Sequence, residues 1–245
     1  MLLGYRFVLE AENHEDLASG RVLRSAPGFP AFPVRLAGEM FHRALALSAR
    51  DVVTLWDPCC GSAHLLTVLS LMHRRRIHHA VGTDIDTAAL ELARRNLALL
   101  SGQGLAARAA ELRERAELFE KPSYTQAAAA AQRLARGLEA EGGDLPHTLE
   151  RADVFDPDQL RRALAGRRPD VVITDVPYGE KSSWSGGSAA TGITGMLRSL
   201  SAVLDDEAVI AVSTRGRKVP VDARARRIAA FRVGTRAVAL FRPAR

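Results

Sequence analysis

The sequence predicts an α/β protein with a doubly wound, Rossmann-like sheet, mostly parallel with an antiparallel C-terminal strand, plus a helical insertion. Short apolar runs alternate with stretches of helical periodicity along most of the chain. Four of these runs end at or just before an aspartate, and the carboxyl ends of parallel strands meet at one crevice. Two further strand-like runs flank Gly234-Thr235, which is a hairpin signal.

The expected elements follow one another in regular alternation. We expect strands over 52–57, 79–84, 147–152, 169–175 and 207–214, and two more within 228–241. Helices are expected over 63–74, 87–100, about 157–165 and 191–204, and over Pro33 to Ser48. The insertion suits two helices, Leu105 to Phe119 and Tyr124 to Ala140. Residues 2–24 show no clean period.

The 245 residues, 47% of them apolar, suffice for one sizeable core. We therefore expect a single domain over 1–245, with an N-terminal segment and helix over 1–50 and the insertion over 103–143. Arg6 and Glu10 interrupt the first apolar stretch, and no run reaches membrane-spanning length. A cytoplasmic protein without a membrane association is expected.

The segment LWDPCCGSAH at 55–64 joins an apolar strand to a helical pattern through a turn of small residues. Such a turn lets backbone N–H groups and a carboxylate approach a nucleotide-type cofactor closely. Asp57, Cys59 and Gly61 are therefore candidate cofactor-binding residues. Strand-turn-helix units of this kind also occur throughout parallel α/β proteins, so the segment alone leaves a purely structural role open.

Three later carboxylates strengthen the prediction of a cofactor site. Asp84 ends the strand about twenty residues after the turn, where such folds bind ribose hydroxyls, and Asp86 suits the N-cap of the next helix. Asp153 follows the third strand and Asp175 ends the fourth. With Asp57, these residues are expected to line one crevice.

Metal chemistry is not indicated. The two cysteines, Cys59 and Cys60, are adjacent inside the turn and suggest neither a disulfide framework nor a zinc site. The seven histidines are scattered along the chain.

The segment Asp175-Val176-Pro177-Tyr178 suits methyl transfer to an exocyclic base amine. The lone pair of such an amine is delocalised, so the nitrogen must be aligned by acceptors such as Asp175 and a backbone carbonyl. Pro177 would stiffen the turn, and Tyr178 would stack on a flipped base. The alternative is a strand end with a partly buried tyrosine. The polar segment 180–188 is typical of a lid loop.

The net charge of +6 is concentrated near the end of the chain. Asp222 is the one acid among residues 215–245, against ten basic residues: Arg215, Arg217, Lys218, Arg224, Arg226, Arg227, Arg232, Arg236, Arg242 and Arg245. This imbalance favours a polyanionic partner. A solvated basic surface from an arginine-rich proteome is the alternative. The mixed charges of the insertion favour a solvated lid or brace over direct RNA contact.

These motifs resemble those of class I S-adenosylmethionine-dependent methyltransferases. The similarity extends to the avilamycin-resistance rRNA (guanine-N2-) methyltransferases of actinobacteria. It rests on SAPGFPAFPVRLA at 25–37, LWDPCCGS at 55–62, LALLS at 97–101 and KPSY at 121–124. The resemblance implies methylation of a guanine exocyclic amine in large-subunit (23S) rRNA, and resistance to an orthosomycin-type antibiotic such as avilamycin. It implies rRNA or the large ribosomal subunit as partner.

The resemblance also implies roles for the site residues. Asp57 and Gly61 would line the methionine part of the cofactor S-adenosylmethionine, Asp84 its ribose and Asp153 its adenine amine. Asp175, Pro177 and Tyr178 would hold the base. The chain departs from the family pattern at Ala63-His64, where a second glycine and often a tyrosine are usual.

Three other functions compete with this prediction. An amino-methyltransferase acting on another RNA or DNA base would use the same Asp-x-Pro-Tyr chemistry. A non-catalytic RNA-binding protein could retain the fold. An NAD-dependent dehydrogenase would leave Asp175 to Tyr178 without a role.

Overall fold

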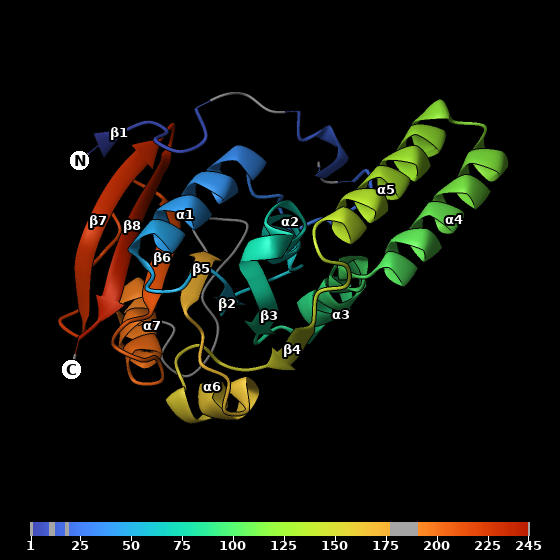
Figure 1. The fold of residues 1–245 in the computed structure, drawn as a ribbon. Coiled ribbons are helices and arrows are strands. Elements are labelled where there is room, and N and C mark those ends of the chain that lie inside the picture. Colours follow the sequence, from blue (N-terminus) through green and yellow to red (C-terminus); the bar gives the residue numbers. More distant parts are fainter. Residues whose placement is uncertain (1, 10–12, 18–19, 177–190, 245) are drawn as a thin grey trace.

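The structure, a computed structural model, describes residues 2–9, 13–17, 20–176 and 191–244. Over these residues it shows an eight-stranded sheet with helices on both faces (Figure 1). The strands are β1 (Leu2–Leu3), β2 (Val53–Asp57), β3 (Ile77–Asp84), β4 (His147–Arg151), β5 (Val171–Asp175), β6 (Val209–Arg215), β7 (Ala225–Val233) and β8 (Arg236–Pro243). The predicted fold class is confirmed.

The helices occupy the predicted segments with small shifts at their ends. They are α1 (Val34–Leu47), α2 (His64–Met72), α3 (Thr87–Leu97), α4 (Gly102–Phe119), α5 (Pro122–Ala140), α6 (Pro157–Leu164) and α7 (Gly192–Ser201). Short 3-10 turns lie at Glu15–Leu17, Arg74–Arg76 and Ala98–Leu100. The expected N-cap is present, because Asp86 accepts a hydrogen bond from the Ala88 N–H over 2.8 Å.

The order of the strands is β1-β7-β8-β6-β5-β2-β3-β4. Strands β2 to β6 run parallel to one another, and β8 runs antiparallel between β6 and β7. The predicted antiparallel C-terminal strand is therefore confirmed as β8. It lies inside the sheet and is buried on both faces, whereas β7 exposes Arg226 and Arg227 and lies nearer the edge.

Side chains alternate along each strand between two cores. On β2, Leu55 belongs to the core beneath α1, α2 and α3, and its neighbour Trp56 belongs to the core beneath α6 and α7. Both residues are completely buried, and the Trp56 indole N–H is satisfied by Thr83 Oγ1 at 3.1 Å. With helices on both faces, the carboxyl ends of the strands are left to form a site.

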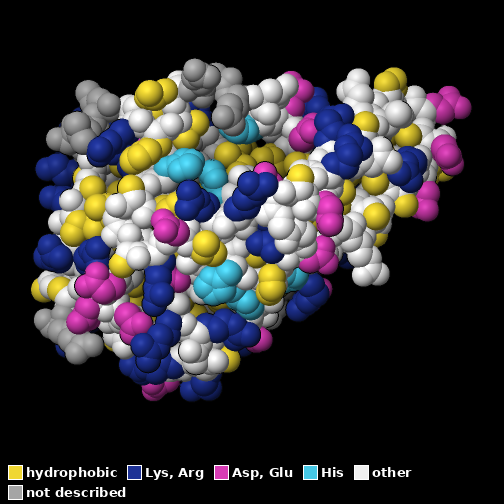
Figure 2. Space-filling model, viewed as in Figure 1, with side chains coloured by type: hydrophobic (Ala, Val, Ile, Leu, Met, Phe, Trp, Pro, Cys, Tyr) yellow, Lys and Arg dark blue, Asp and Glu magenta, His cyan; other side chains and the backbone are white. Residues whose placement is uncertain are grey.

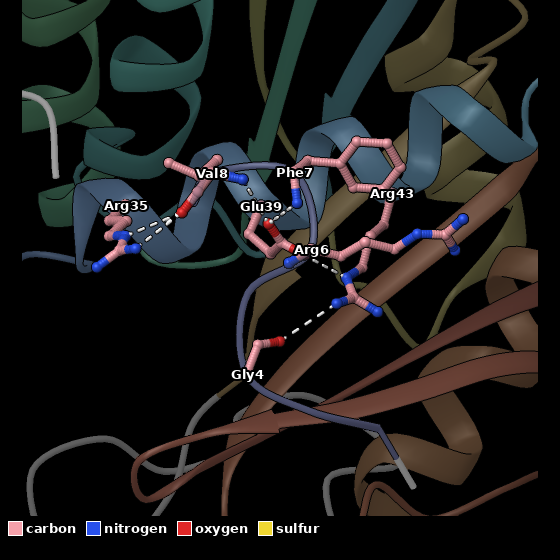
Figure 3. A network of polar contacts seen from close by, with 7 residues as sticks. All are labelled: Gly4, Arg6, Phe7, Val8, Arg35, Glu39 and Arg43. Atoms are coloured by element: carbon pink, nitrogen blue, oxygen red, sulfur yellow. Dashed lines mark hydrogen bonds and ion pairs between the residues drawn. The ribbon is translucent and has the colours of Figure 1, made fainter. Parts of the chain in front are cut away.

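The N-terminal segment is held on α1 by the buried carboxylate of Glu39 (Figure 3). Glu39 accepts hydrogen bonds from the backbone N–H groups of Arg6, Phe7 and Val8 over 2.7 to 3.0 Å. It also accepts one from Arg43 Nε over 2.6 Å. Because a side chain satisfies these backbone groups, the segment needs no regular secondary structure, which explains its lack of periodicity.

The insertion forms a helical hairpin, α4 and α5, that extends away from the sheet (Figure 1). Its base contacts the N-terminal part of the chain. Arg108 on α4 donates to the carbonyl of Val22 over 2.9 Å, and Arg133 on α5 makes two hydrogen bonds to Asp16 over 2.6 and 2.7 Å. In the part of the chain that the structure describes, no helix is both long and apolar enough to cross a bilayer.

Candidate functional site

The carboxyl ends of β2, β3 and β5 and the residues after β4 open onto a cavity of about 630 Å³. All six residues predicted to bind the cofactor line this cavity. They are Asp57, Cys59, Gly61, Asp84, Asp153 and Asp175. The sequence therefore predicted correctly which of these residues come together. Pro177, Tyr178 and the expected lid at 180–188 lie outside the described residues.

A loop from the N-terminal region forms another wall of the cavity. Pro27, Phe29 and Phe32 line it, and Phe32 is buried. The loop passes close to the turn after β2, because a Cβ atom added at Gly61 would lie 3.9 Å from Phe29 Cδ1. Gly61 itself has φ +53°, a left-handed conformation that favours glycine. This loop therefore belongs to the wall of the cavity.

The two cysteines pack inside the turn, and their thiols are not activated as nucleophiles. Cys60 packs against β3 so closely that a Cβ atom on Gly82 would lie 3.2 Å from Cys60 Sγ. Burial raises the pKa of both thiols well above the usual value, and the charges of nearby carboxylates raise it further. Both thiols are therefore protonated and unreactive at neutral pH.

Asp57 is the most deeply buried of the four carboxylates, with 2% of its surface exposed. It accepts a hydrogen bond from the Cys59 N–H over 3.2 Å. Burial raises the pKa of Asp57 to about 7, and the negative charges of Asp84 and Asp175 contribute to the rise. A positively charged ligand in the cavity would relieve this repulsion.

Asp84 and Asp153 are held by backbone N–H groups. Asp84 Oδ2 accepts from Gly61 N over 2.7 Å and Oδ1 from Asp86 N over 3.0 Å, while burial keeps the pKa of Asp84 above its ordinary value. Asp153 Oδ1 accepts from Phe155 N over 2.9 Å. These contacts fix the direction of both carboxylates at the cavity wall.

Asp175 has a cationic partner that the sequence did not reveal. Arg236, the first residue of β8, donates from Nη1 to Asp175 Oδ1 over 2.5 Å, and its side chain is 8% exposed. Arg236 was expected among the cations that meet a polyanion, and that expectation was wrong for this residue. The pairing depends on β8 lying beside β6, which no local pattern shows; the one signal is an arginine at the start of the apolar run RAVALF.

The other basic residues of this stretch that the structure describes lie toward two different ends of the sheet. Arg215 ends β6, and Arg217 and Lys218 follow it as exposed side chains at the cavity end of the sheet. Arg226 and Arg227 lie toward the opposite end, where Arg226 pairs in register with Arg242. On the face drawn in Figure 2, basic and acidic side chains are interspersed. The basic stretch is therefore two surfaces rather than one.

His64 is a cavity residue for which the sequence suggested no role. It begins α2 directly after Ala63, whose φ of 54° is left-handed. The imidazole lines the cavity with 5% of the residue exposed, and neither ring nitrogen has a hydrogen-bond partner among the described residues. Burial lowers its pKa to about 4, so the ring is neutral at pH 7. The signal in the sequence was the departure from the family pattern at Ala63-His64.

Comparison with known proteins places the whole chain in one family. Residues 3–236 match the model of the rRNA methyltransferase AviRa family. The chain is 55% identical over 241 residues to a 23S rRNA (guanine(2535)-N(1))-methyltransferase of Streptomyces viridochromogenes, covering 98% of this chain and 96% of that protein. Two crystal structures of the rRNA methyltransferase AviRa from the same organism superpose with TM-scores of 0.90, at 54% and 53% identity, covering 97% of this chain and 96% of each of theirs. The protein belongs to the AviRa family of rRNA methyltransferases.

Proposed function

We propose that this protein transfers a methyl group from S-adenosylmethionine to a guanine of 23S rRNA in the large ribosomal subunit. The observation that carries the proposal is the convergence of Asp57, Asp84, Asp153 and Asp175 on one cavity, in a chain 55% identical to a 23S rRNA guanine methyltransferase. A cytoplasmic location would give such an enzyme access to ribosomes.

The cavity suits this cofactor in size and charge. Its volume of about 630 Å³ lies in the range of small-molecule sites. Asp84 would bind the ribose hydroxyls, Asp153 the adenine amine, and Asp57, Cys59 and Gly61 the methionine part. When bound, S-adenosylmethionine supplies a methyl group on a positively charged sulfur that leaves as a neutral thioether. The carboxylate cluster, with the pKa of Asp57 raised to about 7 by burial, would favour a cationic ligand.

The acceptor atom separates two versions of the proposal. The Asp-x-Pro-Tyr pattern predicts the exocyclic amine, N2, whereas the name of the 55% identical relative specifies N1 of guanine. We adopt N1. A bond from N1 to the methyl carbon replaces the N1–H bond, so the N1 proton must leave as the carbon–sulfur bond breaks. Asp175 is the described group that we assign to accept this proton, which is a stronger role than hydrogen bonding to an amine.

Pro177 and Tyr178 keep their predicted roles in the proposal. Pro177 would stiffen the turn after Asp175, and Tyr178 would stack on the flipped base. We also propose that the methylation lowers binding of an orthosomycin such as avilamycin, because the family resemblance implies resistance. Growth of a susceptible strain on avilamycin, with the wild-type gene or the Asp175→Ala gene, tests that extension.

The test of the function is nucleoside analysis of 23S rRNA after incubation with the protein and labelled S-adenosylmethionine. Free 23S rRNA, large subunits and whole ribosomes serve as separate substrates, and Asp175→Ala is the control. Labelled 1-methylguanosine supports the proposal, and labelled N2-methylguanosine would replace N1 by the exocyclic amine. The absence of labelled guanosine from all three substrates would overturn the proposed function.

A further inference from the structure

Arg236 contacts three separate segments of the chain at the end of the cavity where Asp175 lies. It begins β8, and its Nη1 donates to Asp175 Oδ1 at the end of β5 over 2.5 Å and to Ser213 Oγ on β6 over 3.4 Å. Its guanidinium carbon lies 4.7 Å from the centre of the Phe32 ring, which lines the cavity. One side chain therefore connects Asp175 to the N-terminal wall of the site.

The environment of this arginine restrains its motion. The Arg236 side chain is 8% exposed, and that of Asp175 is 20% exposed. A planar guanidinium is suited to this position, because one edge can donate to a carboxylate while the face rests on an aromatic ring. A buried ion pair of this kind is costly to desolvate and is weak evidence for a role in stability. The geometry of the pair is better explained by the orientation that Arg236 gives to the Asp175 carboxylate.

We propose that Arg236 is a positioning residue for the methyl-acceptor step: it holds Asp175 Oδ1 and so fixes the direction in which the carboxylate meets the N–H of the target base. This inference rests on the proposed function and assigns a residue to it. Arg236 would act through Asp175, without touching the base itself. It would also hold Asp175 at a fixed distance from Phe32 in the cavity wall.

The charges around Asp175 give the inference a pH signature. Burial raises the pKa of Asp175, and Arg236 opposes that rise, with help from Ser213 and Arg215. The carboxylates of Asp57 and Asp84 line the same cavity. Without the guanidinium, Asp175 would hold its proton to higher pH. A protonated Asp175 cannot accept a proton, so activity would be lost at the acid end of the range.

The experiment compares Arg236→Gln and Arg236→Lys with the wild-type protein. Single-turnover methylation of 23S rRNA is measured across the pH range, and affinity for S-adenosylhomocysteine is measured by calorimetry. For Arg236→Gln we expect a rate loss on the order of 100-fold, typical of a misplaced catalytic group, and an acid limb displaced to higher pH. Arg236→Lys should restore part of the rate and most of the pH profile. Affinity for the cofactor product should be unchanged in both variants.

Arg43→Gln is the matched control, because the Arg43 side chain is also 8% exposed, pairs with the Glu39 carboxylate over 2.6 Å, lies 4.0 Å from the centre of the Phe231 ring and does not line the cavity. It should leave the rate and the pH profile unchanged. If Arg236→Gln does not fold, Arg236→Lys is introduced into both the wild-type protein and the Asp175→Asn variant. In the Asp175→Asn variant, substitution of Arg236 should not reduce the residual rate further.

The inference is overturned if a folded Arg236→Gln variant keeps the wild-type rate and pH profile, or if Arg236→Lys slows the Asp175→Asn variant as much as it slows wild type. Failure of the proposed function is a different result. In that case the wild-type protein itself transfers no methyl group to 23S rRNA.

Discussion

The backbone N–H of Gly61 donates a hydrogen bond to Oδ2 of Asp84 over 2.7 Å. This contact joins the turn after β2 to the end of β3, so the two segments proposed to hold the methionine part and the ribose of the cofactor are also held to each other. Asp84 Oδ1 meanwhile accepts from Asp86 N. The carboxylate therefore helps to order the site as well as to line it.

Replacing Asp84 should weaken cofactor binding. We expect Asp84→Ala to lose on the order of 1–3 kcal/mol of binding free energy for S-adenosylhomocysteine, as for loss of a charge-assisted hydrogen bond. Calorimetry measures the affinity. Asp156→Ala is the control, because Asp156 caps α6 through Asp158 N and Gln159 N and does not line the cavity. Equal affinities of Asp84→Ala and wild type would contradict the ribose assignment.

His64 should help to bind the cofactor at a cost to the stability of the empty protein. Its two buried ring nitrogens lack partners among the described residues, and burial of unpaired polar atoms is unfavourable. We expect His64→Phe to raise the melting temperature and to weaken S-adenosylhomocysteine binding. His73→Phe, directly after the end of the same helix, is the control, since His73 stacks on Phe41 at 4.6 Å and does not line the cavity. It should leave the affinity unchanged; tighter binding by His64→Phe would refute the prediction.

Asp57 should make the protein less stable as pH rises. Its pKa is about 7 in the folded state because of burial, against a usual value near 4. A raised folded-state pKa means that the protonated form favours folding. The contribution is therefore fully present below about pH 4 and is lost as pH rises through about 7. We expect the free energy of unfolding to fall by on the order of 2 kcal/mol from this group between pH 5 and pH 8.

Chemical denaturation at the two pH values measures this effect, with Asp57→Asn as the comparison. The amide does not titrate, so the pH-dependent loss should shrink in the variant. An identical pH dependence in both proteins would exclude Asp57 as its source.

Glu39 should matter for folding rather than for the site. Burial raises the pKa of Glu39, but hydrogen bonds from Val8, Phe7, Arg43 and Arg6 outweigh burial and lower it overall. Glu39→Gln replaces a charged acceptor of four hydrogen bonds and leaves the Arg43 charge without its partner. We expect a loss of about 3 kcal/mol in unfolding free energy. Affinity for S-adenosylhomocysteine should be unchanged in the folded variant, and an unaltered denaturation midpoint would contradict the expectation.

The two basic surfaces should differ in their contribution to rRNA binding. Arg217 and Lys218 lie at the cavity end of the sheet, while Arg226 and Arg227 lie toward the opposite end. We expect Arg217→Gln with Lys218→Gln to weaken binding to 23S rRNA and to reduce its salt dependence, because fewer counterions are released. Arg226→Gln with Arg227→Gln is the charge-matched comparison. A larger effect from that second pair would indicate that the RNA-binding surface lies at the end of the sheet opposite to the cavity.

The four cavity carboxylates could be predicted because each depends on local sequence. An apolar run predicts a strand, and parallel strands bring their carboxyl ends together whatever their order in the sheet. Asp57, Asp84, Asp153 and Asp175 therefore met as expected. The roles assigned to them stay predictions.

Arg236 and Glu39 could not be predicted because their partners are set by non-local packing. Arg236 meets Asp175, 61 residues away, only because β8 enters the sheet beside β6. Glu39 accepts hydrogen bonds from N–H groups more than 30 residues away, in a segment with no periodicity. A sequence pattern shows which residues are charged, whereas the fold decides which of them become partners.

The interior position of β8 also bears on when this enzyme becomes competent during its own synthesis. Strands β2 to β6 can pair in the parallel part of the sheet before β8 has left the ribosome, and the cavity carboxylates come from elements up to β5. A nascent chain that ends before Arg236 would thus carry all four carboxylates but leave β6 as an open edge and Asp175 without its guanidinium. If the proposed roles hold, binding of the cofactor could precede completion of the chain, whereas methyl transfer at its full rate would require the completed chain.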